Sequence, residues 1–359
     1  MSIRRRGPAA VRRGTAAVVA LAAALTLAAC GSDGGSADSG SGSASSGGAE
    51  NGAGKKAAVA TGGKDFADAA RKTATFGTDA RPGQFPRTIT HAMGTTELKA
   101  RPERVVVLDV GEFDNVVSLG VEPVGYAPTE GDEGIPSYLK QGAGNPKDVG
   151  TINSLNLEAI AALKPDLILG SQLRAADKYK ELSSIAPTVF SIRPGFPWKE
   201  NYLLNAQALD RTAEAKAALA AYDKKAAALA ADLGPDKPTV SMVRYMPDKL
   251  RLYAKASFIG TILDDVGLPR PENQQIEDLA VEISPEKIDD ADADWIFTGV
   301  YGDPSKTERD TARSNPLWKN LKAVKEGRAK DVKDETWYLG LGVTAAGLVL
   351  DDLRGYLVK

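Results

Sequence analysis

WKENYLLNAQALDRTAEAKAALAAYDKKAAALAADL, residues 198 to 233, is the stretch that decides the fold. Its 36 residues contain no Gly and no Pro, and the helix formers Ala, Leu, Glu and Lys dominate it. Apolar residues recur three, four or seven positions apart, as along one face of a helix. At about 1.5 Å per residue, such a helix would be roughly 50 Å long. Asp210-Arg211-Thr212 has the composition of a fresh N-cap, so we expect one rod, or two pieces with a break near Asp210.

Two similar segments flank this helix. Residues 157–160 (LEAI) precede 165–169 (PDLIL), and residues 285–288 (PEKI) precede 293–297 (ADWIF). Glu, Ile, Asp and Ile recur at the same offsets in both segments, and each segment indicates a short helix that feeds a buried strand. Any α/β unit contains part of this pattern, but the matching offsets favour a duplication. The predicted fold class is therefore α/β, with two similar α/β lobes on either side of a long helix.

The remaining elements follow from short apolar runs and helical stripes. Strands are predicted at 88–93, 105–108, 121–126, 188–192, 239–244, 249–253 and 329–332, the last but one forming a hairpin with the strand before it. Helices are predicted at 113–119, 179–185, 257–266, 316–324 and 344–357. Residues 170–174 and 274–283 are predicted to be loops.

The N-terminus carries an export signal. Residues 1–13 hold five Arg and no acidic residue, residues 15–27 are small and apolar, and Leu27-Ala28-Ala29-Cys30 follows. A basic head and a short apolar run indicate a signal peptide over residues 1–29. The closing tetrapeptide resembles the lipobox of bacterial lipoproteins, which implies that Cys30 is acylated and becomes the mature N-terminus; an ordinary cleaved signal is the alternative. A flexible Gly/Ser/Ala tether is predicted to follow, with residues 30–86 outside the lobes and 55–85 either poorly ordered or an arm.

Bulk composition excludes several classes of function. The 359 residues suit two domains, and a formal net charge of −2 argues against a nucleic-acid partner. One Cys excludes an intrachain disulfide, and one His, His91, excludes a His-based metal cluster. We expect His91 to be structural or solvent-facing. Phosphate loops with a Lys, Gly-x-Ser-x-Gly elbows and His-Glu-x-x-His are absent, and nothing singles out a catalytic pair among 47 acidic residues.

Arginine and aromatic residues dominate the predicted ends of the strands. In open α/β sheets ligands bind at the carboxyl ends of strands, and two lobes can bring these ends to one cleft. Arginine recognises anionic oxygens, and Tyr and Trp add flat apolar area with one polar atom. We therefore expect a bulky, oxygen-rich ligand. The strand-end residues are Asp109, Tyr126, Arg174, Arg193, Arg244, Arg251, Tyr253, Tyr301 and Trp337.

A family resemblance joins these features. Its phrases are Pro102–Leu108, Asn156–Ile160, Lys164–Leu169, Ile185–Val189, Ser257–Gly260, Ile283–Glu286 and Asn315–Trp318. In this order, behind a lipobox and a tether, they resemble the iron–siderophore substrate-binding lipoproteins of ABC importers, which are class III periplasmic binding proteins. The resemblance runs from about Arg87 to Lys359. It implies an N-terminal lobe at 87–197, a bridging helix at 198–211 and a C-terminal lobe at 212–359, with the ligand between the lobes.

The resemblance also implies roles for residues. The ligand would be a ferric siderophore that brings its own iron ligands, so neither a cofactor nor a protein metal site is expected. Glu158 and Glu286, one per lobe, match carboxylates that dock onto a permease dimer; helix N-terminal charge stabilisation is the alternative. The second repeat strand leads to Tyr301 rather than to a third Arg, which favours a hydroxamate such as a ferrioxamine over a catecholate. The candidate siderophore-binding residues are Arg174, Arg244, Tyr126, Tyr253, Tyr301, Trp198 and Trp337.

We accordingly expect a monomeric binding protein, not an enzyme, lipid-anchored at the extracellular face of the cell membrane. One alternative keeps the fold and exchanges the ligand for a corrinoid or a haem, although a single His disfavours haem. A second alternative is a secreted hydrolase of the cell envelope.

Overall fold

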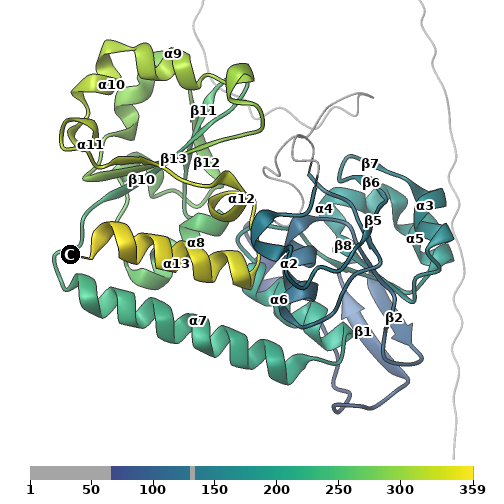
Figure 1. Cartoon of the computed structure of the whole chain (residues 1–359). Coiled ribbons are helices and arrows are strands. Elements are labelled where there is room, and N and C mark those ends of the chain that lie inside the picture. The colour runs from purple at the N-terminus through teal and green to yellow at the C-terminus, as the bar shows by residue number, and fades with distance from the viewer. Residues whose placement is uncertain (1–65, 130–133, 359) are drawn as a thin grey trace, which may run out of the picture. The chain divides into compact units, whose positions relative to one another are not determined.

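The computed structural model describes residues 66–129 and 134–358, in which two five-stranded sheets form the centres of two lobes (Figure 1). The predicted signal peptide, Cys30 and most of the predicted tether lie outside the described residues. None of the described helices combines the length and apolar character needed to cross a membrane. The predicted class, two α/β lobes with a long helix, is confirmed.

The N-terminal lobe is built on a parallel sheet of strand order β5-β4-β3-β8-β9. Its central strands are buried on both faces, as apolar runs in parallel sheets are. Phe113 and Val116 of α2 cover one face, and Ile160 of α3 and Leu182 of α5 cover the other. The strands are β3 (Val105–Val107), β4 (Gly125–Tyr126), β5 (Lys147–Asp148), β8 (Leu167–Ser171) and β9 (Thr188–Ser191), and the main helices are α2 (Val110–Ser118), α3 (Leu157–Ala162) and α5 (Tyr179–Ile185).

Smaller elements complete this lobe. They are α1 (Ala69–Thr73), α4 (Gln172–Ala175), the 3-10 helices η1 (Ser137–Leu139) and η2 (Ala176–Lys178), and the antiparallel pairs β1 (Arg87–His91) with β2 (Gly94–Leu98) and β6 (Gly150–Thr151) with β7 (Ser154–Leu155). Helix α1 lies in the segment predicted to be either poorly ordered or an arm, and Phe66 packs on the lobe, which agrees with an arm. Helix α4 replaces the loop predicted at 170–174, since β8 continues to Ser171 and the chain turns directly into a helix.

The C-terminal lobe has the strand order β12-β11-β10-β13-β14. Strands β10, β13 and β14 are parallel, and β11 and β12 add an antiparallel edge, so the predicted hairpin is confirmed. Residues 280–283 form the edge strand β12 rather than the predicted loop, because four residues carry too little alternation to be recognised. The strands are β10 (Val240–Tyr245), β11 (Leu250–Tyr253), β12 (Ala280–Ile283), β13 (Trp295–Val300) and β14 (Ala329–Asp331).

Helices cover both faces of this second sheet. Phe297 and Met242 face α7 (Thr212–Leu233), α8 (Phe258–Val266) and α13 (Val343–Leu357), whereas Ile296 faces the opposite helical layer. The helix predicted at 316–324 is interrupted at Leu321, which is buried and extended between α10 and α11. The other helices are η3 (Glu272–Gln274), η4 (Pro285–Ala291), η5 (Pro304–Lys306), α9 (Arg309–Ser314), α10 (Pro316–Asn320), α11 (Lys322–Lys325) and α12 (Asp334–Trp337).

The duplicated segments occupy matching places in the two sheets. Helix α3 precedes β8, and η4 precedes β13, so each copy is a short helix followed by a buried strand, as predicted. The second helix is a 3-10 helix rather than an α-helix, with Lys287 outside the helical region of φ and ψ. The repeated sequence pattern therefore predicted the buried strand more accurately than the type of helix before it.

The long helical stretch consists of α6 (Trp198–Ala208) and α7 (Thr212–Leu233), so the predicted break is confirmed. Asp210 at the break has φ of 56°, a left-handed conformation that Asp tolerates better than most residues. Its carboxylate does not cap α7. It accepts hydrogen bonds from the Gly83 backbone N–H at 3.0 Å and from Arg87 Nη2 at 2.7 Å, and it pairs with Arg101. The break is thereby fastened to the N-terminal lobe.

One apolar cluster runs through both lobes. It contains Val107 of the first sheet, Tyr202 of α6, Tyr222 of α7, and Phe297 of the second sheet. Helices α7 and α13 lie side by side beneath the second sheet in Figure 1. Across the lobes, Asp114 of α2 accepts hydrogen bonds from the backbone N–H groups of Thr344 and Ala345, both at 3.0 Å, and so stabilises the beginning of α13.

Replacing Asp210 by Asn is expected to lower the free energy of unfolding by about 1–3 kcal/mol, since Arg87 would lose a buried charged partner. Burial raises the pKa of Asp210, but hydrogen bonds from Arg101, Gly83 and Arg87 outweigh it and lower the pKa from 3.8 to about 2. This contribution to stability is therefore present above pH 3.8 and is lost as the pH falls toward 2. Urea unfolding at several pH values measures it.

The matched control is Asp232→Asn, because Asp232 pairs with Arg354 on the exposed surface. Its effect on the free energy of unfolding should stay within about 0.5 kcal/mol. A loss at Asp210 that equals the control, or that persists unchanged at pH 2, would contradict the assigned ion pairs.

Candidate functional site

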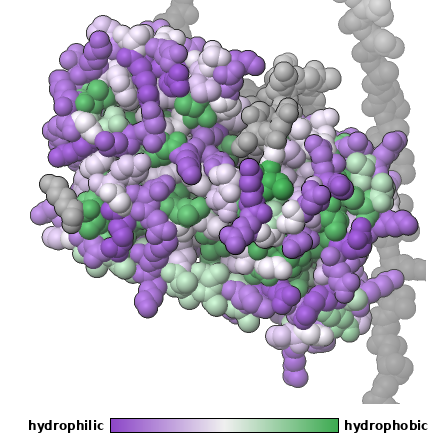
Figure 2. All heavy atoms as spheres, viewed as in Figure 1, coloured by the Kyte–Doolittle hydropathy of each residue, from purple (hydrophilic) through white to green (hydrophobic). Residues whose placement is uncertain are grey.

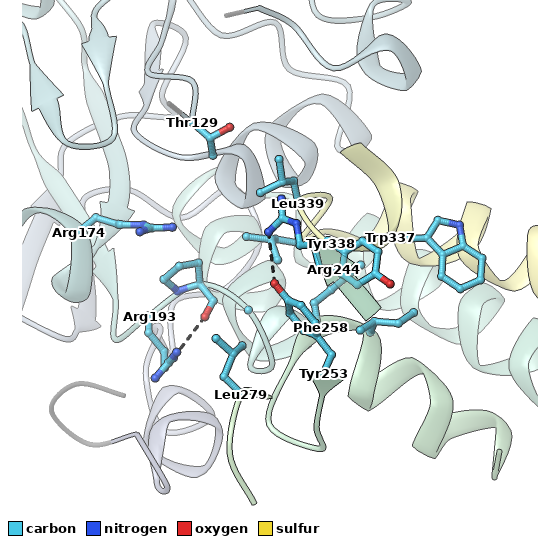
Figure 3. Close-up of a pocket in the computed structure, with 14 residues that line it drawn as sticks. Thr129, Arg174, Arg193, Arg244, Tyr253, Phe258, Leu279, Trp337, Tyr338 and Leu339 are labelled. Atoms are coloured by element: carbon cyan, nitrogen blue, oxygen red, sulfur yellow. Dashed lines mark hydrogen bonds between the residues drawn. The ribbon is translucent and has the colours of Figure 1, made fainter. Parts of the chain in front are cut away.

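A cavity lies where the carboxyl ends of the two sheets meet, and residues of both lobes line it (Figure 3). It holds about 550 Å³ of empty space, including the part that opens to solvent at its mouth. The N-terminal lobe contributes residues after β8 and β9, and the C-terminal lobe contributes β10, β11, α8 and the α12 region. The lining residues are Thr129, Arg174, Arg193, Pro194, Gly195, Arg244, Tyr253, Phe258, Ile259, Leu279, Trp337, Tyr338, Leu339 and Leu341.

Arg244 lies in the wall of the C-terminal lobe, near the end of β10, with 0% of its side chain exposed. Its Nε donates to Asp334 Oδ1 at 2.7 Å, its Nη2 donates to Asp334 Oδ2, and its Nη1 donates to the Tyr253 hydroxyl at 3.2 Å. Burial alone would lower the pKa of Arg244, but the Asp334 carboxylate raises it above its ordinary value. The guanidinium is therefore charged and held in one orientation, and these three bonds use three of its five N–H groups.

Arg174 is its counterpart in the N-terminal lobe, one turn past β8. Its Nε donates to Asp109 Oδ2 at 3.0 Å, and Asp109 is fully buried at the beginning of α2. Glu112 lies beside this pair, and one of its carboxyl oxygens, Oε2, is buried without a hydrogen-bond partner. Burial, and secondly the Asp109 charge, raises the pKa of Glu112 to about 8. Burial thus favours the protonated form of Glu112.

Arg193 follows β9 and adds a third guanidinium to the lining. It lies over the rings of Phe66 and Phe196, at 4.2 Å and 5.4 Å from their centres. Burial, and secondly the charge of Arg174, lowers the pKa of Arg193 to about 10. Positive charge is therefore concentrated here at an energetic cost that an anionic ligand would relieve.

Four of the seven candidate binding residues line this cavity: Arg174, Arg244, Tyr253 and Trp337. Tyr301 stands close by, with its ring centre 4.8 Å from the Arg244 guanidinium carbon. Trp337 is fully buried, and its indole points toward α13, where Nε1 donates to Asp352 at 2.9 Å. Its contribution to the cavity wall is thus made while its polar atom is engaged elsewhere.

Tyr126 and Trp198 are not brought to the cavity. Tyr126 stacks on Phe113 at 4.2 Å and lines a separate hollow beside β5. Trp198 is fully buried between Tyr222 and Phe258, and its Nε1 donates to Thr261 at 2.9 Å. The sequence position of an aromatic residue, near a strand end or at the beginning of a helix, therefore did not show whether it packs in the core or lines the cavity.

Several lining residues were not among the candidates. Arg193 belonged to the strand-end group but was not carried into the binding set, although its position after β9 is the same signal that marked Arg174. Tyr338 gave no signal, because it follows a four-residue helix rather than a strand. It donates from its hydroxyl to the backbone carbonyls of Val243 and Phe297. Asp334, which does not line the cavity but pairs with Arg244, gave no sequence signal either.

The remaining predicted residues lie outside the cavity. Glu158 and Glu286 are exposed, each in the first turn of the short helix before its repeat strand. His91 is buried, with Nε2 2.9 Å from Thr96 Oγ1, and its pKa is lowered to about 4 by burial, so its predicted structural role is supported. Residues 66–129 and 134–358 contain no cluster of three or more His, Cys, Asp or Glu that could hold a metal ion.

The chain is similar to a known protein family, to relatives from Bacillus subtilis and to a solved structure. A family model described as periplasmic binding protein matches residues 105–336. The chain is 39% identical to the probable siderophore-binding lipoprotein YfiY of Bacillus subtilis (strain 168), over 76% of this chain and 88% of the relative. It is 33% identical to the Fe(3+)-citrate-binding protein YfmC of the same strain, over 72% and 82% of the two chains. The solved structure of Staphylococcus aureus SirA complexed with staphyloferrin B superposes with a TM-score of 0.67 at 36% identity, covering 75% of this chain and 98% of SirA.

Proposed function

Because the chain belongs to the periplasmic binding protein family, we propose that it is the substrate-binding component of an ABC importer and captures a ferric siderophore. The observation that carries the proposal is the cavity between the lobes, in which Arg174, Arg193 and Arg244 approach one space from both sides. Guanidinium groups recognise carboxylate and hydroxamate oxygens with directed, charge-assisted hydrogen bonds. The aromatic side chains of Tyr253, Phe258 and Tyr338 supply apolar area for the linkers of such a ligand.

Iron is cargo in this proposal and not a resident cofactor. A siderophore surrounds ferric iron with its own oxygens, so the protein recognises the outer surface of the complex. This agrees with a cavity wall of arginine and aromatic residues. The protonated form of Glu112 beside Arg174, which burial favours, leaves one fewer negative charge near the ligand.

The ligand class is proposed to be hydroxamate or carboxylate rather than catecholate. The hydroxamate expectation came from the absence of a third Arg after the second repeat strand, and Tyr301 does occupy that place beside Arg244. The third Arg of the cavity, Arg193, comes instead from the N-terminal lobe. Relatives are named for citrate and staphyloferrin B, which widens the proposal toward carboxylate oxygens.

Transport requires two further contacts, both proposed. Glu158 and Glu286 would dock one lobe each onto the two halves of a permease dimer, and their exposed positions in matching repeat segments support this. Acylated Cys30 would hold the protein as a monomer at the extracellular face of the membrane. Hydrophilic residues cover most of the face seen in Figure 2, and the exposed large apolar side chains among the described residues are Ile276 and Leu317.

The first test is a titration of the purified protein with hydroxamate, citrate-type and catecholate iron complexes. Trp337 lines the cavity, so the ferric form of the cognate ligand is expected to quench Trp fluorescence. The iron-free form should bind at least tenfold more weakly, because it lacks the compact arrangement of oxygens that the arginines meet; this corresponds to about 1.4 kcal/mol. Equal indifference to the ferric and iron-free forms across the whole panel would overturn the proposal.

The other readings have less support. The only His, His91, is buried away from the cavity and bonded to Thr96, which leaves a haem without an imidazole ligand. A corrinoid is tested by adding it to the same panel. The cell-envelope hydrolase is disfavoured because the similar proteins carry names of binding proteins.

A further inference from the structure

Two of the three cavity arginines have an aspartate behind them. Asp334 pairs with Arg244 in the C-terminal lobe, and Asp109 pairs with Arg174 in the N-terminal lobe. Asp109 is fully buried, and the Asp334 side chain is 16% exposed. Neither aspartate lines the cavity, so the guanidinium of its arginine partner separates each carboxylate from the space that a ligand would fill.

The backbone around Asp334 makes room for this arrangement. Gly299 of β13 lies opposite Arg244 in the sheet register, and a Cβ atom at this position would come within 2.8 Å of Asp334 Oδ1 and would also collide with the Tyr338 ring. A larger residue at 299 would require the Tyr338 ring, the Asp334 carboxylate or both to shift. The pairing is therefore built into the sheet and does not depend on a flexible surface side chain.

The pairing divides the donors of Arg244. Its Nε and one N–H of Nη2 point to Asp334, and one N–H of Nη1 points to Tyr253, so two of its five N–H groups take no part in these bonds, although the side chain is fully buried. Arg244 can thus donate directed hydrogen bonds while its positive charge is already balanced. Arg174 uses only Nε for Asp109 and keeps the outer part of its guanidinium for the cavity.

We propose that Asp334 and Asp109 are specificity-determining residues that limit the negative charge of the siderophore complex the cavity accepts. The inference rests on the proposed function. A ligand oxygen at Arg244 or Arg174 is attracted by the guanidinium and repelled by the carboxylate behind it, and the repulsion grows with each negative charge on the ligand. Directed donors remain, so recognition of oxygens is kept while highly anionic complexes are disfavoured.

Siderophore chemistry supplies ligands that differ in this property. Three hydroxamate groups carry one negative charge each and neutralise ferric iron. Three catecholate groups carry two each and leave the complex trianionic. The wild-type protein should therefore prefer a neutral ferric trihydroxamate to a ferric tricatecholate, and the preference should depend on the two aspartates.

The experiment compares Asp334→Asn with the wild-type chain in titrations with both complexes. Asn keeps the size of the side chain and removes its charge. The expected result is a change of at least tenfold in the ratio of the two dissociation constants, in favour of the tricatecholate, which corresponds to about 1.4 kcal/mol. If the wild-type protein shows no tricatecholate binding, its detection limit enters the ratio, and measurable binding by Asp334→Asn counts as the shift.

The ratio separates this role from two others. A structural role would weaken both complexes equally and leave the ratio unchanged, and a role in orienting Arg244 would shift the ratio toward the trihydroxamate; either result overturns the proposal. Asp331→Asn is the matched control, because Asp331 pairs with Arg313 in the same lobe outside the cavity, and it should leave the ratio unchanged. If Asp334→Asn does not fold, Asp109→Asn makes the same test in the other lobe. Binding of none of the iron complexes by the wild-type protein would instead refute the proposed function.

Discussion

Replacing Glu158 and Glu286 together by Arg is expected to abolish siderophore uptake by cells while the purified protein still binds its ligand. The two carboxylates are exposed, one on each lobe, in the first turns of α3 and η4. The Ser284 side chain lowers the pKa of Glu286, which keeps this carboxylate charged at neutral pH. Family resemblance implies Arg-lined sockets on the permease, and a like charge facing each socket costs several kcal/mol. Uptake should fall on the order of a hundredfold or more, as measured with radiolabelled iron complexes.

A matched control keeps the number and sign of the charge changes. Glu181 of α5 and Glu326 after α11 are also exposed, one in each lobe, and lie outside the repeated segments. The double variant Glu181→Arg and Glu326→Arg should retain uptake. Normal uptake by the Glu158 and Glu286 variant, or equal loss in the control, would end the docking assignment.

Replacing Arg244 by Ala is expected to have the largest effect on ligand binding. Loss of a charge-assisted hydrogen bond costs about 1.5–3 kcal/mol, which weakens binding roughly tenfold to hundredfold. Arg244 is fully buried, and its removal takes away one donor from Asp334 and one from the Tyr253 hydroxyl. Urea unfolding should therefore show a loss of stability alongside the loss of affinity.

Arg313→Ala separates the two effects. Arg313 pairs with Asp331 and contacts the Tyr245 hydroxyl in the same lobe but does not line the cavity. This control should lose some stability and keep its affinity for the ferric ligand. Affinity unchanged in Arg244→Ala, measured at a temperature where both variants are folded, would remove Arg244 from the site.

The architecture was accessible from the sequence because strong periodicity and repetition carry it. The absence of Gly and Pro over 198–233 predicted the long helix, and Asp210 predicted its break. Equal offsets around Glu158 and Glu286 predicted matching strands, which are β8 and β13. Short elements such as α4 and β12 were not predicted, because four residues are too few for a helical or strand period to be recognised.

The candidate site was accessible only in part. Arginines at strand ends were informative because parallel strands end on one edge, and this rule placed Arg174 and Arg244 correctly at one cavity. Aromatic residues were less informative, since Tyr126 also lies at a strand end but stacks on Phe113 away from the cavity. The partner of Arg244 could not be predicted from the sequence, because Asp334 lies 90 residues away along the chain and only folding brings the two together.

The apolar cluster shared by the two lobes has a mechanical consequence. Wide parting of the lobes would expose part of this shared cluster, at a cost of about 25 cal/mol for each Å² of apolar surface. Wide opening of the two lobes is therefore energetically unfavourable. If the protein serves an ABC importer as proposed, contact with the permease would have to supply the free energy for such an opening.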